Sequence, residues 1–113
     1  MQNIHAQLNH YPASAQKVRL ILDLVRGKSA VEALEMLRFE PKTPAAAVHK
    51  LLASAVANAE ENFGISRDNL FVAKIFANEA PTRKWRRFGA RGRFKPLLRR
   101  SAHVTVILRE RGS

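Results

Sequence analysis

Cysteine is absent from the 113-residue chain. Its absence excludes disulfide frameworks, thiol nucleophiles and zinc sites built on cysteine ligands. No stretch approaches the roughly 18 to 20 consecutive apolar residues that a membrane span needs. The stretch from Met1 to Tyr11 also lacks the basic leader and apolar run of a secretory signal. We therefore expect a soluble, intracellular protein without a membrane partner.

Negative charge is also scarce, because nine aspartates and glutamates stand against 20 lysines and arginines. The formal net charge is +11, and the isoelectric point is about 11.3. A solvated protein gains nothing from so much self-repulsion, so the composition predicts a polyanionic partner. The length fits one domain, residues 1–113, and a hydrophobic content of 46% is enough for one small core.

The positive charge is concentrated in one segment. The 20 residues from Pro81 to Arg100 contain nine basic residues and no acidic ones. The nine are Arg83, Lys84, Arg86, Arg87, Arg91, Arg93, Lys95, Arg99 and Arg100. The other 93 residues hold 11 basic and nine acidic residues, a net charge of +2. The sequence therefore predicts a nearly neutral body that carries one strongly cationic segment.

Hydrophobic periodicity predicts a strand and then a helix at the start of the chain. Residues 2–10 alternate apolar and polar side chains, as a half-buried strand does. Ser14 is a predicted N-cap, and Gly27 is a predicted C-terminal stop. Between them an apolar stripe has helical spacing. Its members are Val18, Ile21, Leu22 and Val25.

Two further helices are predicted before the next strand. Ser29 and Glu32 form a capping box, and Pro41 lies at or past the end of this second helix. The predicted buried face is Ala30, Ala33, Leu34 and Leu37. Thr43 is a predicted cap, followed by Pro44 at the first helical position of the third helix. Its apolar stripe runs through Val48, Leu51, Leu52, Ala55, Val56 and Ala59 before Gly64, and alanines 45–47 suggest close packing.

The last two predicted core strands lie on either side of the cationic segment. Leu70 to Ala77 is rich in β-forming residues and is predicted to be buried on both faces. In the strand from His103 to Arg109, the residues Val104, Val106 and Leu108 share one side. The order of elements predicts an α+β fold, with a small antiparallel three-stranded sheet packed on three helices.

A structureless connection of about 25 residues between two strands is uncommon in a compact domain. Gly89 and Gly92 flank the middle of the cationic segment and favour a reversal of direction. We therefore predict a long, protruding basic β-hairpin arm over residues 80–102. About ten residues in each strand would reach roughly 33 Å. Such an isolated, like-charged hairpin needs a partner to hold it.

The side chains of this arm are of the types that bind RNA. Arginine forms bidentate hydrogen bonds with phosphate and stacks on bases. Trp85, Phe88 and Phe94 are interleaved with the cations and can stack on unpaired bases. The predicted RNA contacts of the arm are Arg83, Lys84, Trp85, Arg86, Arg87, Arg91, Arg93, Lys95, Arg99 and Arg100. A solvated loop or a targeting signal is the alternative, but neither needs a tryptophan and two phenylalanines.

A second, smaller basic patch lies on or near the polar side of the first helix. Its candidate RNA contacts are Lys17, Arg19, Arg26 and Lys28. Taken alone, such cations are more often simply solvated.

No pattern favours catalysis, a metal or a cofactor. Gly27-Lys28-Ser29 resembles the end of a phosphate-binding loop, but that loop needs a glycine at position 22, which is leucine here. The four histidines show no ligand spacing on a common element. Glu60 and Glu61 are adjacent and do not face each other on a helix. We predict that the protein is not an enzyme and has no small-molecule substrate.

Five stretches, in order along the chain, resemble one known family. They are Ser14 to Arg19, Asp23 to Lys28, Ser54 to Ala59, Ala90 to Arg93 and His103 to Ile107. Their sequence and order are similar to large-subunit ribosomal protein number twenty-two over nearly the whole chain. The sequence departs from the family pattern where a glycine is replaced before Pro81 and a basic residue is replaced by Gly89.

The resemblance implies a structural constituent of the large ribosomal subunit, in the cytoplasm or in an organelle. It implies that the protein binds large-subunit ribosomal RNA, supports subunit assembly and contacts neighbouring ribosomal proteins. It also implies a hairpin whose tip lines the exit tunnel and meets the nascent polypeptide. On matching positions, Lys84, Arg91 and Arg93 are basic hairpin residues. The implied tip residues are Phe88, Gly89, Ala90, Arg91 and Gly92.

Two other functions remain open from the sequence. One is an architectural DNA-binding protein whose β-ribbon arm embraces a duplex. Such proteins carry an apolar wedge at the tip of the arm, and Phe88 keeps this hypothesis open. The other is a small hydrolase or nuclease, against which the lack of an acidic cluster argues.

Overall fold

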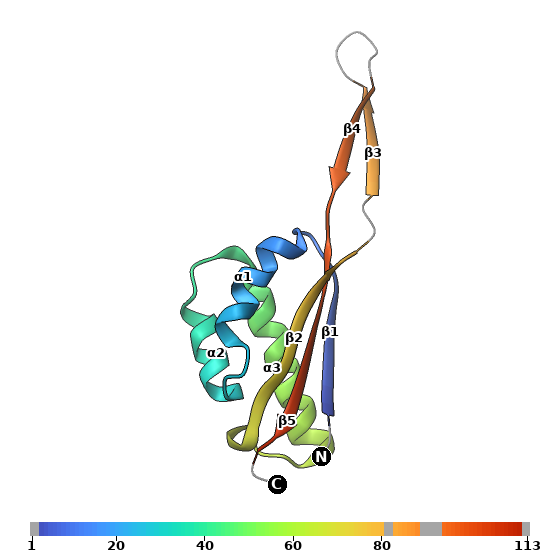
Figure 1. Cartoon of the computed structure of the whole chain (residues 1–113). Coiled ribbons are helices and arrows are strands. Elements are labelled where there is room, and N and C mark those ends of the chain that lie inside the picture. Colours follow the sequence, from blue (N-terminus) through green and yellow to red (C-terminus); the bar gives the residue numbers. More distant parts are fainter. Residues whose placement is uncertain (1–2, 81–82, 89–93, 112–113) are drawn as a thin grey trace.

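The computed structural model describes residues 3–80, 83–88 and 94–111, with only the backbone described for 83–88 and 94–99. These residues form three α-helices, a short 3₁₀-helix and five strands (Figure 1). In chain order they are β1 (Asn3–Tyr11), α1 (Ala15–Val25), α2 (Ala30–Phe39), α3 (Thr43–Phe63), η1 (Arg67–Asn69), β2 (Leu70–Glu79), β3 (Arg83–Phe88), β4 (Phe94–Arg99) and β5 (Ala102–Glu110).

The body is a three-stranded antiparallel sheet covered on one face by the three helices (Figure 1). The strand order is β1-β5-β2, so the last strand in the sequence is the central one. Both neighbours pair with β5 in antiparallel register. This arrangement confirms the predicted α+β fold with its three-stranded sheet and three helices.

The core lies between the sheet and the helices. The predicted stripe of α1 is fully buried, as are the apolar stripes of α3 and β5. In α2 the residues Ala30, Ala33 and Leu37 are buried, whereas Leu34 is only partly covered. Of the three alanines at the start of α3, Ala45 is buried and Ala46 is exposed. Burial of side chains on one side of each element drives the layers together, since water is excluded from the apolar surface between them.

Most predicted helix ends are confirmed. The Ser14 hydroxyl accepts from the Lys17 N–H at 3.4 Å, and the Ser29 hydroxyl accepts from the Glu32 N–H at 3.2 Å. Gly64 ends α3 in the left-handed conformation at φ 66°. The predicted cap at Thr43 is wrong by one residue.

The N-cap of α3 is Lys42, which makes no side-chain capping bond, and Thr43 is already helical. Pro44 therefore sits one position further into the helix than predicted. A proline is tolerated there because the N–H groups of a first helical turn have no partner within the helix.

β2 is buried on one face, and the prediction of burial on both faces is wrong. Leu70 and Val72 point to the helices, and so do Ile75 and Ala77. A register shift against β5 between Val72 and Lys74 separates the two pairs. Such a bulge adds one residue and reverses the alternation. Apolar residues therefore occupy both odd and even positions of the strand although only one face is covered.

β3 and β4 pair with each other in antiparallel register, from Arg83 opposite Arg99 to Phe88 opposite Phe94. They lie beyond the end of the three-stranded sheet (Figure 1), and the whole molecule extends 65 × 26 × 18 Å. The chain reaches this ribbon from β2 and returns through β5. Between ribbon and body, the Ala80 N–H donates to the Ser101 carbonyl at 2.9 Å.

Candidate nucleic-acid interface

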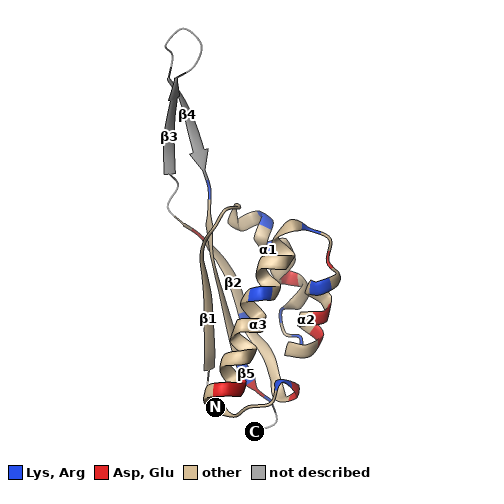
Figure 2. Ribbon diagram, turned by 180° about the vertical axis from the view of Figure 1, so that it is seen from behind, with Lys and Arg blue, Asp and Glu red and all other residues tan. Residues whose placement is uncertain are grey.

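The four candidate residues of the first-helix patch are all exposed in the structure. Lys17 and Arg19 lie on α1 outside its buried stripe, Arg26 is the C-cap of this helix, and Lys28 lies in the link to α2. Figure 2 shows basic residues on and near α1, with acidic residues on α2 and near the end of α3. The patch has the exposure and the charge that an interface with a polyanion needs.

Two of these four cations have a partner within the protein. Arg19 donates from Nε and Nη2 to the Ala77 carbonyl, at 3.1 and 2.8 Å. Arg26 donates from Nη2 to the Ile75 carbonyl at 2.9 Å, and its Nη1 pairs with the Asp23 carboxylate. Both carbonyls belong to β2, an edge strand of the sheet. These arginines therefore fix α1 against the sheet, a role that the sequence analysis missed.

The link between α1 and α2 covers the same sheet edge. The Gly27 N–H donates to the Val72 carbonyl at 3.1 Å, and the Val72 N–H donates to the Lys28 carbonyl at 2.9 Å. Ser29 forms an isolated bridge with Phe71. The amides of Gly27 and Lys28 are engaged with the protein, since the Lys28 N–H donates to the Val25 carbonyl. This geometry is unlike a phosphate-binding loop, whose amides point at the ligand.

In the ribbon, the register sets like charges opposite one another. Arg83 lies opposite Arg99, and Arg87 lies opposite Lys95. Like charges directly across an antiparallel pair destabilise it. Trp85, between these two pairs on β3, lies opposite Leu97. An anion that neutralises the cations would remove this repulsion, so the backbone register itself favours a polyanionic partner.

Several predicted contacts fall where the structure gives less detail. Lys84, Arg86 and the residues just named are placed only by the β3 and β4 backbone. Arg91, Arg93 and the tip residues Gly89, Ala90 and Gly92 lie outside the described residues. Arg100, in the link to β5, is exposed. The RNA contacts predicted for the arm stay predictions.

A third group of cations lies on the face of the sheet that the helices leave uncovered. Lys74 pairs in register with Ile107, and Phe71 pairs with Arg109. Arg111 follows β5 and sets its guanidinium 5.7 Å from the centre of the Phe71 ring. The sequence analysis missed these cations because they are scattered in the sequence. The alternation within β5 was a signal that could have found Arg109. Because successive side chains of a strand point to opposite faces, Arg109 lies on the face away from buried Leu108.

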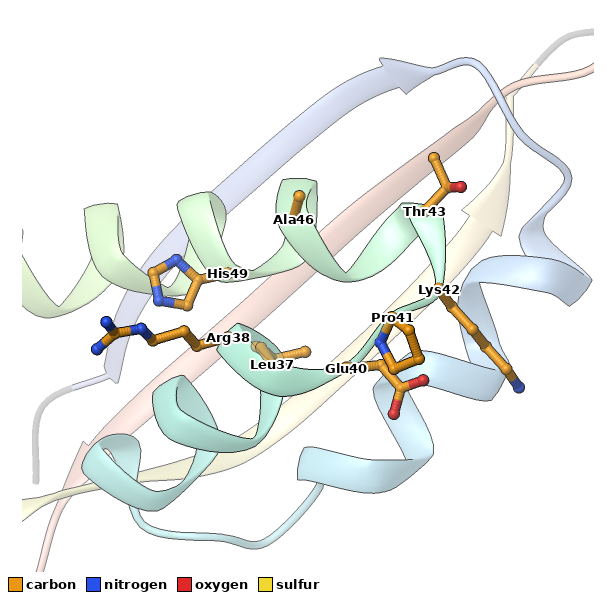
Figure 3. Close-up of a pocket in the computed structure, with 8 residues that line it drawn as sticks. All are labelled: Leu37, Arg38, Glu40, Pro41, Lys42, Thr43, Ala46 and His49. Atoms are coloured by element: carbon orange, nitrogen blue, oxygen red, sulfur yellow. The ribbon is translucent and has the colours of Figure 1, made fainter.

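A hollow of about 500 Å³ lies between the end of α2 and the start of α3 (Figure 3). Arg38 and His49 line one end and Lys42 the other, while the Glu40 carboxylate points away from His49. The lining therefore sets up no acid–base pair between these two residues.

Across residues 3–80, 83–88 and 94–111, no three histidine or carboxylate side chains gather as metal ligands. His10 and His103 do meet, with ring centres 4.6 Å apart, and the His10 N–H donates to His103 Nδ1 at 3.2 Å. They hold an irregular point in the pairing of β1 with β5. Among the described helices, none has the length and apolarity of a membrane span.

A small α+β body with cationic surfaces and a two-stranded basic ribbon defines a class of basic proteins suited to a polyanionic partner. Comparison with known proteins gives the family. A family model described as ribosomal protein L22p/L17e matches residues 6–109. The large ribosomal subunit protein uL22 of Pediococcus pentosaceus is 46% identical over 98 residues, which cover 87% of this chain and 83% of that protein. The chain belongs to the L22p/L17e family, a family of structural, non-enzymatic proteins of the large ribosomal subunit.

Proposed function

We propose that this chain binds large-subunit ribosomal RNA and helps the subunit to assemble. The observation that carries the proposal is the clustering of nine cations and no carboxylate between Pro81 and Arg100, within the family match. The backbone register that sets Arg83 opposite Arg99 supports it. In this function the protein is a structural component and carries out no catalytic step.

The proposed mode of binding is neutralisation of phosphates by the arm, residues 80–102, together with the first-helix patch. Arginines of the arm contact phosphates, and its aromatic residues stack on unpaired bases. Lys17 on α1 and Lys28 in the link to α2 contact phosphates, near the arginines that fasten this helix to β2. Binding then combines the protein's fixed shape with many ionic contacts.

We further propose that the tip, Phe88 to Gly92, lines the nascent-peptide exit tunnel. The partners are then ribosomal RNA, neighbouring ribosomal proteins and the growing polypeptide. A photo-crosslinker introduced in place of Ala90 should capture stalled nascent chains in purified ribosomes. The same group in place of Lys42, on the helix layer, is the matched control. Equal capture from both positions would contradict the tunnel assignment.

Salt dependence tests the RNA-binding proposal. With six to ten phosphate contacts, affinity for a large-subunit RNA fragment should fall roughly 10³- to 10⁵-fold between 50 and 200 mM salt. Replacing Arg83, Arg86 and Arg87 together by glutamine should lower the slope of log affinity against log salt by about 2 to 3. The control replaces Arg38, Lys42 and Lys50, which are exposed on the helix layer.

Equal slopes for the two triple variants would contradict the role of the arm. Competition with duplex DNA then separates the two nucleic acids. The RNA fragment should displace the protein from DNA far better than the reverse. Equal or better binding to DNA would support the architectural DNA-binding alternative and overturn the proposal.

A further inference from the structure

The uncovered face of the three-stranded sheet has an ordered set of side chains. Three outward residues of the central strand β5, namely Thr105, Ile107 and Arg109, are flanked by register partners on both β1 and β2. The rows across the sheet are Asn3–Arg109–Phe71, His5–Ile107–Lys74 and Gln7–Thr105–Phe76, and His103 pairs with Asn78 beside them. Neighbouring strands lie about 4.7 to 4.9 Å apart, so each row is a continuous strip of side chains.

The bulge in β2 creates this face. Phe76 lies five positions after Phe71, an odd interval, so regular alternation would put the two rings on opposite sides of the sheet. The register shift between Val72 and Lys74 reverses the alternation and brings both rings to the outer face. Phe76 is 39% exposed, although its neighbours Ile75 and Ala77 are buried. The fold therefore holds an apolar ring at the surface on a rigid strand.

The charge of this face has one sign. Lys74, Arg109 and Arg111 are its cations, with two histidines and several amides around them. Within the described part of the chain, no carboxylate occupies an outward register position of the three strands. Glu79 and Glu110 pair with Ala102 and Leu70, which are buried on the helix side. A nucleic acid is electrostatically complementary to this face.

Two cations of this face already contact other side chains of the protein. The Arg109 Nε donates to the Asn3 Oδ1 at 2.7 Å, and Arg111 lies over the Phe71 ring. Phe76 carries no such cation in the described contacts, and its ring stays partly open to a ligand. A partly exposed ring beside cations suits an unpaired base, which offers its face for stacking and its phosphate for ionic contact.

We propose that the outer face of the sheet is a second RNA-binding surface, which takes an unpaired segment of ribosomal RNA. A base stacks on Phe76, and the adjoining phosphates contact Lys74 and Arg109. The inference rests on the proposed ribosomal RNA function and adds a surface separate from the arm and α1. The polar amides and single charge sign favour RNA over an apolar protein partner.

Binding of full-length variants to large-subunit ribosomal RNA tests this surface. Phe76→Ala and Phe76→Leu should each weaken binding roughly 5- to 150-fold, because stacking on the ring is lost. Phe76→Trp should retain affinity. Phe39→Ala is the matched control, since Phe39 is 75% exposed but lies at the end of α2. Unfolding midpoints equal to that of the unchanged protein show that the variants are folded.

A second variant examines the cations without touching the ring. Lys74→Gln should lower the slope of log affinity against log salt by about 0.7 to 0.9, the value for one phosphate contact. Lys42→Gln, an exposed cation at the start of α3, should leave the slope unchanged. Ultraviolet crosslinking should also join β2 peptides to the RNA.

The outcomes separate this inference from the proposed function. If the unchanged protein binds and the Phe76 and Lys74 variants bind as their controls do, the outer face is not an RNA surface, and the proposed function stands. If those variants bind RNA normally but enter subunits poorly, a protein covers the face and the inference is overturned. Failure of the unchanged protein to bind ribosomal RNA would sink the proposed function and this inference with it.

Discussion

The guanidinium of Arg19 donates two hydrogen bonds to the carbonyl oxygen of Ala77, at 3.1 Å from Nε and 2.8 Å from Nη2. This contact joins the first helix to an edge strand that lies 58 residues later in the chain. Edge strands expose unpaired carbonyls that can recruit other strands. Arg19 satisfies one of them and Arg26 satisfies another, at Ile75. The same residues that looked like free cations in the sequence are also part of the scaffold.

Loss of this contact should destabilise the fold. Arg19→Ala should lower the free energy of unfolding by about 1.5 kcal/mol, the lower end for hydrogen bonds to charged groups, because the side chain is exposed. Lys17→Ala, which truncates another exposed cation of the same helix, should stay within about 0.5 kcal/mol of the unchanged protein. Urea denaturation measures both. Equal losses would show that the bonds to Ala77 add no stability.

The two sides of α1 should respond differently to the same truncation. Leu22 is fully buried, and Leu22→Ala should cost about 2 to 5 kcal/mol because it leaves a cavity in the core. Leu20 is 56% exposed, so Leu20→Ala should cost less than about 1 kcal/mol. Denaturant unfolding measures the difference, provided that the dependence of the unfolding free energy on denaturant concentration is the same in all three proteins. Similar costs at the two positions would contradict the orientation of α1.

The end of α3 depends on a backbone conformation that favours glycine. Gly64 has φ 66°, and an added Cβ atom would meet nothing within 4 Å. The cost of Gly64→Ala is therefore purely conformational and should be about 1 kcal/mol. Gly64→Asn should cost less, since asparagine tolerates the left-handed region better. Thermal unfolding midpoints should be highest for the unchanged protein, lower for Gly64→Asn and lowest for Gly64→Ala. A Gly64→Ala variant as stable as the unchanged protein would refute the reasoning.

One ion pair should give the stability a dependence on pH. Arg67 holds the pKa of Glu60 below its usual value, chiefly through a side-chain hydrogen bond that outweighs the opposing effect of desolvation, and to a lesser extent through its charge. The two bonds measure 2.9 and 3.3 Å. A carboxyl whose folded pKa is lowered stabilises the fold above its unfolded pKa. That contribution is lost as the pH falls through the folded value.

The test compares Glu60→Gln with the unchanged protein from neutral to strongly acidic pH. The variant should be slightly less stable at neutral pH, and the difference should shrink towards acid. In an Arg67→Gln background the same substitution should have little pH dependence, because the partner is absent. If the stability difference caused by Glu60→Gln does not change with pH in either background, the ion pair with Arg67 is not the source of the pH dependence.

The sequence by itself determined the secondary structure, the fold class and the separation of charge. These depend on local patterns: the apolar stripe of α1, the serine caps at positions 14 and 29, and the glycine at 64 each act within a few residues. The cationic segment is likewise visible as a run of residues. The candidate contacts of the arm and of α1 could therefore be named in advance.

Only the tertiary structure decided which side chains of β2 face the helices and which face outward. The sequence cannot show the bulge after Val72, because the bulge is defined by pairing with a strand more than 30 residues away. This shift exposes Phe76 on the outer face, which the local pattern had predicted to be buried. Arg19 and Arg26 likewise looked like solvated cations until the sheet edge lay beside α1. Local energetics fix where elements begin and end, whereas long-range pairing fixes which side chains they present.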